Sequence, residues 1–144
     1  MRRVVLDTNV FLDCWVFDDP LARPLRAALE TGATAPVRSV ATDAELAVVL
    51  ARPQFRLADS ARSALLGQWR SRAALVEVAL FATIRCTDAD DQKFLDLAFA
   101  AGAHALFTKD KALLATAARA RPLGLQVARP QAAQSVLLFE DRAT

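Results

Sequence analysis

Four acidic residues lie far apart in the chain, yet each falls where a short apolar strand should end or an apolar helix should begin: Asp7, Glu45, Asp91 and Asp110. The carboxyl ends of parallel strands meet at one edge of a sheet, where clefts form. We expect no Arg or Lys of the same motifs to pair with these acids, so the gathered carboxylates would repel one another. Because hard divalent cations prefer oxygen ligands, the pattern predicts a magnesium or manganese site.

Helical spacing separates the inward acids from the outward ones. Asp91 shares a stripe with Leu95, whereas Asp96 falls with Gln92 and Lys93 on the side expected to face solvent. We therefore predict Asp91 as the inward acid of its motif.

Each acid also has a purely structural interpretation. Asp7 could form a turn with Thr8 and Asn9, and Glu45 could be a surface residue at the edge of an apolar stripe. Asp110 could cap a helix, a role that is compatible with binding a cation.

Apolar runs bounded by Asp, Gly and Pro predict strands that alternate with helices. Strands are expected over residues 4–6, 36–41, 103–107 and 125–128, with helices over residues 25–30, 43–52, 60–72, 88–101 and 110–120. Thr42 or Asp43 should cap the second helix. Residues 76–84 fit a helix or a strand, as do residues 130–139. The alternation predicts a parallel sheet covered by helices on both faces, in a single domain over residues 1–144.

Composition narrows the function classes. The net charge of +2 gives no polybasic argument for nucleic acid or membrane, although the many Arg residues would suit phosphate. Cys14 and Cys86 have no metal-ligand spacing, which argues against a zinc site. The longest uncharged run, residues 97–108, is too short to span a bilayer, and no signal-peptide pattern is present. We expect a cytoplasmic protein with reduced thiols.

Four short motifs, in this order and spacing, resemble those of PIN-domain proteins: Asp7-Thr8-Asn9, Glu45-Leu46 before Val49-Leu50-Ala51-Arg52-Pro53, Asp90-Asp91-Gln92-Lys93-Phe94-Leu95, and Phe107-Thr108-Lys109-Asp110. The similarity spans about residues 3–115. Within that family the chain is most similar to toxin components of bacterial toxin-antitoxin systems.

The resemblance implies a three-layer α/β/α fold and an endoribonuclease that uses magnesium or manganese to cut single-stranded RNA. It implies products with a 5′ phosphate and a 3′ hydroxyl. It also assigns the acids catalytic and metal-ligand roles: Asp7, Glu45 and Asp91 as ligands, with Asp110 as a fourth acid. Asn9 and Thr108 would be supporting polar groups. Many relatives carry a further acid where this chain has Ala112, which argues against a second metal ion.

Partners follow from the same resemblance and from the remaining charges. Four basic residues are candidates for phosphate contact: Arg52, Arg56, Lys109 and Lys111. An antitoxin protein is implied by the family alone. The apolar run Leu137-Leu138-Phe139 favours a homodimer. His104 has no partner by spacing for metal or triad chemistry, so we expect a structural role.

Two other functions stay open at this point. Asp7 could be the covalent nucleophile of a metal-dependent phosphohydrolase, but the second acid that haloacid-dehalogenase-like enzymes place two residues later is replaced by Asn9. The chain could also be a catalytically inactive module that binds RNA or a protein partner. Acids at all four positions argue against that alternative.

Overall fold

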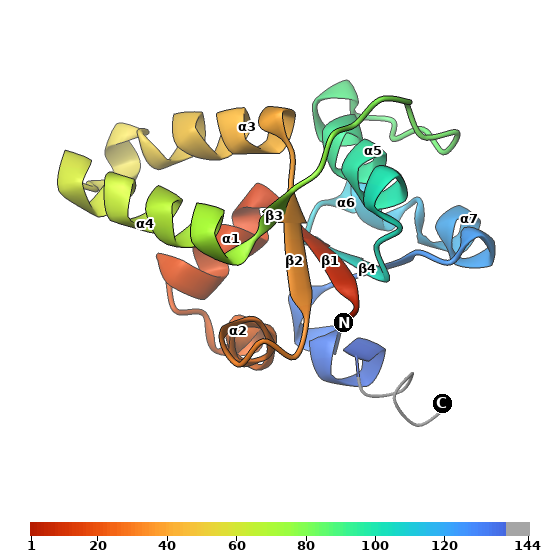
Figure 1. Cartoon of the computed structure of the whole chain (residues 1–144), viewed down its shortest axis with the longest axis horizontal. Coiled ribbons are helices and arrows are strands. Elements are labelled where there is room, and N and C mark those ends of the chain that lie inside the picture. Colours follow the sequence, from red (N-terminus) through yellow and green to blue (C-terminus); the bar gives the residue numbers. More distant parts are fainter. Residues whose placement is uncertain (138–144) are drawn as a thin grey trace.

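The computed structural model describes residues 1–137, and its centre is a five-stranded parallel sheet with the order β3-β2-β1-β4-β5. The strands are β1 (Arg3–Leu6), β2 (Ala35–Arg38), β3 (Ala74–Leu75), β4 (Ala105–Phe107) and β5 (Gln126–Ala128). The chain builds the sheet outward from β1 in one direction and then continues from β4 in the other. The strand order therefore reverses between β1 and β4 (Figure 1).

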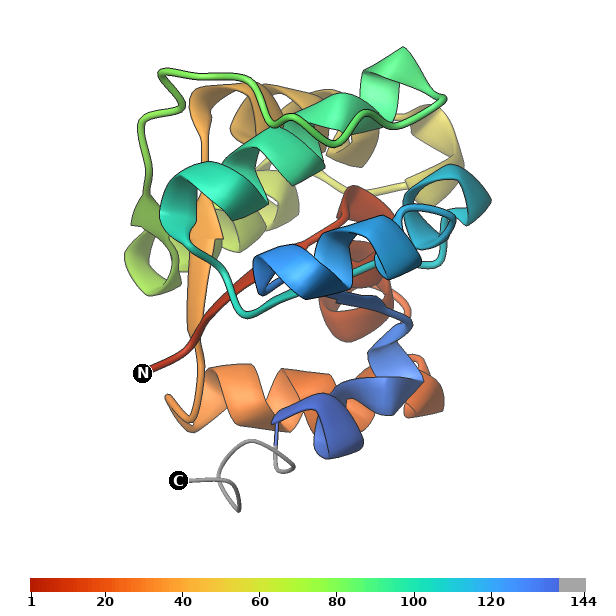
Figure 2. The ribbon, with the colours of Figure 1, turned by 90° about the vertical axis from the view of Figure 1, so that its right-hand side faces the viewer.

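Helices cover both faces of this sheet, as the sequence predicted (Figures 1 and 2). The α-helices are α1 (Thr8–Trp15), α2 (Arg23–Glu30), α3 (Val40–Leu50), α4 (Asp59–Arg72), α5 (Gln92–Ala101), α6 (Lys111–Leu114) and α7 (Ala117–Ala120). Short 3-10 helices are η1 (Pro20–Ala22), η2 (Pro53–Phe55), η3 (Ala89–Asp91), η4 (Arg121–Leu123) and η5 (Pro130–Ala132). The architecture is a three-layer α/β/α fold.

Alternation along the central strands creates the two cores. Val4 and Leu6 of β1 enter a cluster with side chains of α1, α2, α3 and α4, whereas Val5 enters a second cluster with α5 and α7. Phe107 and Leu106 of β4 divide in the same way. Because successive strand residues point to opposite faces, one short apolar strand supplies both layers.

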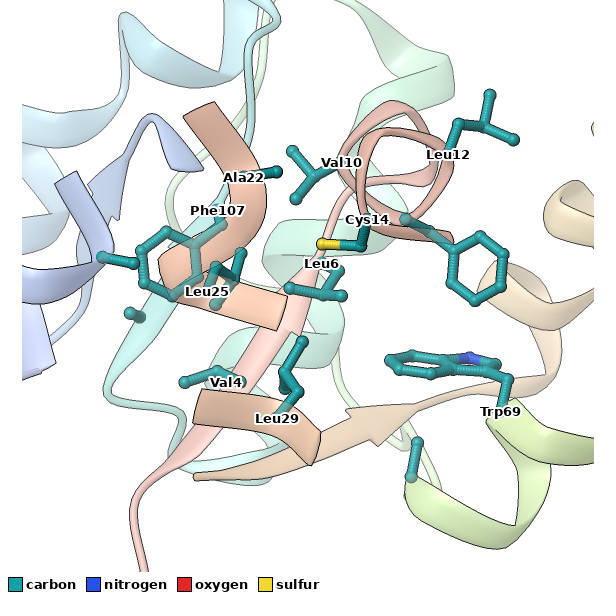
Figure 3. Packing of buried hydrophobic residues seen from close by; sticks show 14 of the residues in the cluster. Val4, Leu6, Val10, Leu12, Cys14, Ala22, Leu25, Leu29, Trp69 and Phe107 are labelled. Carbon is teal, nitrogen blue, oxygen red and sulfur yellow. The ribbon is translucent and has the colours of Figure 1, made fainter. Parts of the chain in front are cut away.

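An aromatic group anchors α4 to the first core. Phe11 lies 5.0 Å from Trp15 and 5.4 Å from Trp69 between ring centroids, the second pair being edge-on. Figure 3 shows Trp69 beside the packed side chains of α1 and α2. Such pairs add about 0.5–1.5 kcal/mol beyond their buried area.

Three local features differ from what the sequence predicted. Residues 8–15 form α1, a helix that was not predicted, because Val10 and Phe11 are buried against the core. Ser39 caps α3 in a reciprocal box with Thr42, whereas Asp43 forms an ion pair with Arg38 at 2.6 Å. The helix expected over residues 110–120 is interrupted between α6 and α7.

The two ambiguous segments also resolve. Residues 76–84 contain no helix or strand, and the strand precedes them as β3. Residues 130–137 are helical, beginning with η5. Residues 138 and 139 of that prediction lie outside the described residues, together with most of the run proposed for dimerisation. Within residues 1–137, no helix has the length and apolar character needed to cross a bilayer.

Asp96 was wrongly placed on the solvent side of α5. Its side chain is buried, and Oδ1 accepts hydrogen bonds from the backbone N–H of Ala82 at 2.8 Å and from Gln92 Nε2 at 3.0 Å. Gln92 is buried too, and it accepts from the N–H of Cys86 while donating to the carbonyl of Ile84. This polar pair fixes the irregular segment, because a buried chain without ladder bonds needs other partners.

Replacing Asp96 by Ala should lower the free energy of unfolding by about 2 kcal/mol, because two buried donors lose their acceptor. Denaturant unfolding followed by circular dichroism measures this loss. Asp59→Ala is the matched control, since the Asp59 side chain is 93% exposed and its ion pair with Arg62 lies at the surface, where such pairs contribute little to stability. A loss below about 0.5 kcal/mol, the usual range of surface substitutions, would contradict the role assigned to Asp96.

Candidate active site

The candidate site lies where the strand order reverses, the place at which open α/β sheets bind ligands. Asp7 directly follows β1, and Thr108 directly follows β4. The backbone N–H of Asp7 donates to the carbonyl of Phe107 at 3.0 Å. Two segments about a hundred residues apart in the sequence are thus joined at one point of the sheet edge.

Asp7 is a buried carboxylate that accepts a hydrogen bond from the hydroxyl of the residue directly after β4. Its side chain is 4% exposed, and Oδ2 accepts a hydrogen bond from Thr108 Oγ1 at 2.7 Å. Burial raises the pKa of Asp7, and the charges of Glu45 and Asp110 raise it further, although the Thr108 hydroxyl and the Asn9 backbone amide act in the opposite direction. Asp7 is therefore harder to ionise than an ordinary aspartate.

Thr108 connects Asp7 to Asp110. Its fully buried hydroxyl donates to Asp7 and accepts the backbone N–H of Asp110 at 3.0 Å. Oδ1 of Asp110 caps α6 by accepting the backbone N–H groups of Ala112 at 2.8 Å and Leu113 at 3.3 Å. The predicted cap is confirmed, and it uses one carboxylate oxygen of Asp110.

Asp91 ends η3 at the start of α5, and its Oδ2 atom is buried without a hydrogen-bond partner. The pKa of Asp91 is raised to about 7. Desolvation is the largest cause, and the charges of Asp110, Asp88 and Asp7 raise the pKa further. Asp91 and Asp110 are close enough to share a proton. When both are ionised, neither can donate to the other, so this corner of the site favours either a proton or a cation.

Glu45 differs from the other three acids because it has a cationic partner. Lys93 Nζ lies 2.7 Å from Glu45 Oε1, and the hydroxyl of Thr8 donates to Oε2. Lys93 Nζ also donates to the carbonyl of Asp90 at 2.6 Å. The expectation that no Lys or Arg of these motifs pairs with the acids was wrong. Lys93 leaves the solvent side expected for it because the Glu45 carboxylate is within reach across α3 and α5.

A second Lys of the motifs is also paired. Lys109 Nζ lies 2.6 Å from Oδ2 of Asp13, a residue of α1 that is 4% exposed. This ion pair fastens the segment after β4 to α1. Sequence reasoning missed Asp13 because α1 itself was not predicted, and without a helix there was no spacing from which to place it.

Among the other predicted residues, Asn9 reaches the acids through its backbone amide, which bonds to Asp7. Arg52 and Arg56 flank η2 at the turn between α3 and α4, and both are exposed. Asn9 and Lys111 are exposed as well. Their predicted roles in supporting the site or binding phosphate stay predictions.

The structure thus brings the four acids within electrostatic reach of one another, with Glu45 partly neutralised. Within residues 1–137, no three side chains of Asp, Glu, His or Cys are arranged to hold a metal ion as they stand. The donor chemistry nevertheless suits a hard cation, because Asp91 offers a buried oxygen without a donor beside two more carboxylates.

Comparison with known families decides the identity. The family model described as PIN domain matches residues 3–112, which include all four acids and the sheet edge that joins them. The chain belongs to the PIN-domain family. A comparison with curated proteins gives no match.

The family places this PIN domain among nucleases, which are hydrolases of phosphodiester bonds and typically use divalent metal ions. The matched range supports the predicted resemblance over nearly the same residues.

The raised pKa of Asp91 predicts an inverse dependence of stability on pH in the absence of metal. Between the ordinary value near pH 3.8 and the folded value near pH 7, the unfolded chain has lost this proton while the folded chain retains it. The folded state then binds more protons, so the contribution of Asp91 to the free energy of unfolding falls as pH rises through this window. Asp7 contributes in the same direction.

The difference in melting temperature between Asp91→Asn and wild type isolates this contribution from other titrating groups. In chelator, the melting temperature of Asp91→Asn relative to that of wild type should increase steadily from pH 4 to about pH 7 and then become constant. A difference that is independent of pH would contradict the repulsion described for this site.

Proposed function

We propose that this PIN domain is a ribonuclease that cleaves single-stranded RNA with one bound magnesium or manganese ion. The observation that supports the proposal most is the Asp91 carboxylate, whose buried oxygen lacks a donor and faces the charges of Asp110 and Asp7. An aspartate with a purely structural role would cap a helix, as Asp88 does, or form an ion pair, as Asp43 does.

Asp7, Asp91 and Asp110 would hold the ion. Their combined charge fits a divalent cation, and each has an oxygen that is not committed to capping a helix. When bound, the ion would activate water and stabilise the charge that develops on the scissile phosphate. No Ser, Cys or His nucleophile is required for such a reaction.

The protein's own residues prepare this chemistry. Thr108 orients Asp7 and the backbone of Asp110 through one hydroxyl, so the two acids cannot move independently. The Asp13–Lys109 pair holds the same segment against α1. Preorganised charges of this kind act strongly in sites shielded from water.

Glu45 has a different role in this proposal. With Lys93 on one oxygen and Thr8 on the other, it holds the Lys93 ammonium between α3 and the turn at Asp90. That ammonium is a point charge suited to a phosphate of the RNA, and Lys111 is an exposed second candidate. Arg52 and Arg56 would contact RNA farther along α3.

A role as a toxin neutralised by an antitoxin, a homodimeric state and a cytoplasmic location complete the proposal at a finer level. The first rests on the resemblance to toxin components. The homodimeric state rests on the apolar run Leu137-Leu138-Phe139, most of which lies outside the described residues.

Cleavage of labelled single-stranded RNA tests the proposal directly. Wild type should cut in magnesium or manganese and stop in chelator. Asp7→Asn and Asp91→Asn should each lose at least about a hundredfold in rate, the scale on which charge-stabilising groups act. Asp59→Asn, which changes an exposed acid, should leave the rate unchanged.

Activity that survives in both site variants would contradict the proposal and point to a contaminating nuclease. A phospho-enzyme trapped on Asp7 would favour the phosphohydrolase instead. RNA binding without cleavage by the wild type would favour an inactive module, for which the Lys93–Glu45 pair is the supporting observation.

Metal-dependent stabilisation separates the ligands from the positioning residue. A metal ion at ten times its dissociation constant should stabilise the fold by about 1.4 kcal/mol. We expect Asp91→Asn to abolish most of this gain and Glu45→Gln to keep most of it, as measured by the melting temperature with and without metal. Equal losses in the two variants would make Glu45 a ligand of the same rank.

A further inference from the structure

A groove of about 670 Å³ shares one residue with the acidic site, because Lys93 lines the groove and pairs with Glu45. Its walls come from the start of α3, from η3 and the start of α5, and from the irregular chain over residues 76–85. Figure 2 shows this irregular chain crossing above α3 and α5. The volume falls within the range of about 300–1,000 Å³ that is usual for small-ligand sites.

The groove contains an aromatic side chain that is largely exposed to solvent. Phe81 lines it and is 81% exposed, and Val40 on the opposite wall is 76% exposed. The chain around Phe81 is nevertheless fixed, because the N–H of the next residue, Ala82, is bonded to the buried Asp96 carboxylate. An exposed ring on an anchored backbone is a preformed stacking surface rather than a loose loop tip.

Two cationic side chains and the exposed carboxylate of Glu77 line the same groove. Arg85 lines it from the irregular chain, where its carbonyl is held by the Arg119 guanidinium at 3.1 Å. Lys93 lines it from α5 and contacts Glu45 at 2.7 Å. Lys93 therefore belongs both to the groove and to the acidic site, so one extended ligand could occupy the two.

We propose that this groove binds one nucleotide of single-stranded RNA beside the scissile phosphate, with the base stacked on Phe81 and the adjoining phosphates on Lys93 and Arg85. This inference rests on the proposed function, since it places the RNA that the acids would cut. Bases stack on aromatic side chains with little regard to sequence, while phosphates suit the Arg and Lys charges. The buried Gln92 and Asp96 side chains complete the lining, with hydrogen bonds that hold the irregular chain in place.

Binding is measured apart from cleavage. Fluorescence anisotropy of a labelled single-stranded RNA would be followed in chelator, with Asp7→Asn as the common background. Phe81→Ala should weaken binding about tenfold, the effect of losing one stacked base, whereas Phe81→Tyr should keep it. Leu80→Ala is the matched control, because Leu80 is 83% exposed and does not line the groove. Arg85→Gln should weaken binding and lower the slope of log affinity against log salt by about one.

Equal affinity of the Phe81→Ala and Leu80→Ala variants would overturn the inference. It would also be overturned if Phe81→Ala left RNA binding intact but abolished self-association or capture of a protein partner, because the ring would then serve a protein interface. The nuclease proposal is tested separately. If Phe81→Ala weakens RNA binding but wild type shows no metal-dependent cleavage, the nuclease proposal is wrong and the groove proposal stands. If wild type cleaves RNA but Phe81→Ala binds it normally, the groove proposal is wrong and the nuclease proposal stands.

Discussion

The repulsion among carboxylates at the end of β1 and β4 is the constraint on which the other features of this PIN domain depend. Parallel strands that reverse their order between β1 and β4 leave an opening at the sheet edge, and Asp7 and Thr108 lie on its two sides. Asp91 and Asp110 reach the same opening from the starts of α5 and α6. Burial strengthens the repulsion, because the site is less screened than an exposed surface.

One ion pair limits this repulsion, and a second lies on the neighbouring segment. Lys93 pairs with Glu45, one of the four acids, and Lys109 pairs with the buried Asp13. Neither ammonium neutralises Asp7 or the Asp91–Asp110 corner, whose charge is left for an incoming cation or a proton. The arrangement keeps four acids near one another in a folded chain while leaving part of their charge uncompensated.

Four of the five strands of the sheet and the segments that carry the acids could be predicted, because they depend on local patterns. The run Val4-Val5-Leu6 before Asp7 and the caps at Asp88 and Asp110 act over a few residues. Helix α1 could not be predicted, since Asn9 and Val10 are poor helix formers and the helix is stabilised by tertiary packing of Phe11 and its neighbours.

The partners of the charged side chains could not be predicted from the sequence either. Helix α5 is buried around most of its circumference, so its periodicity could not place Asp96. Whether Lys93 turns toward solvent or toward Glu45 depends on the distance between α3 and α5, which no local pattern encodes. The order of the motifs identified the site, while the contacts that divide its acids into paired and unpaired ones are tertiary.

The number of protons released on metal binding tests the claim of uncompensated charge most directly. Titration calorimetry with manganese in buffers of different ionisation enthalpy measures this number. The proton held near Asp91, whose pKa is about 7, should leave when a cation binds, so about one proton should be released at pH 6 and almost none at pH 8.5. Asp91→Asn should release fewer protons than wild type at pH 6. Metal binding that releases no proton at pH 6, or that is unchanged in Asp91→Asn, would contradict the account.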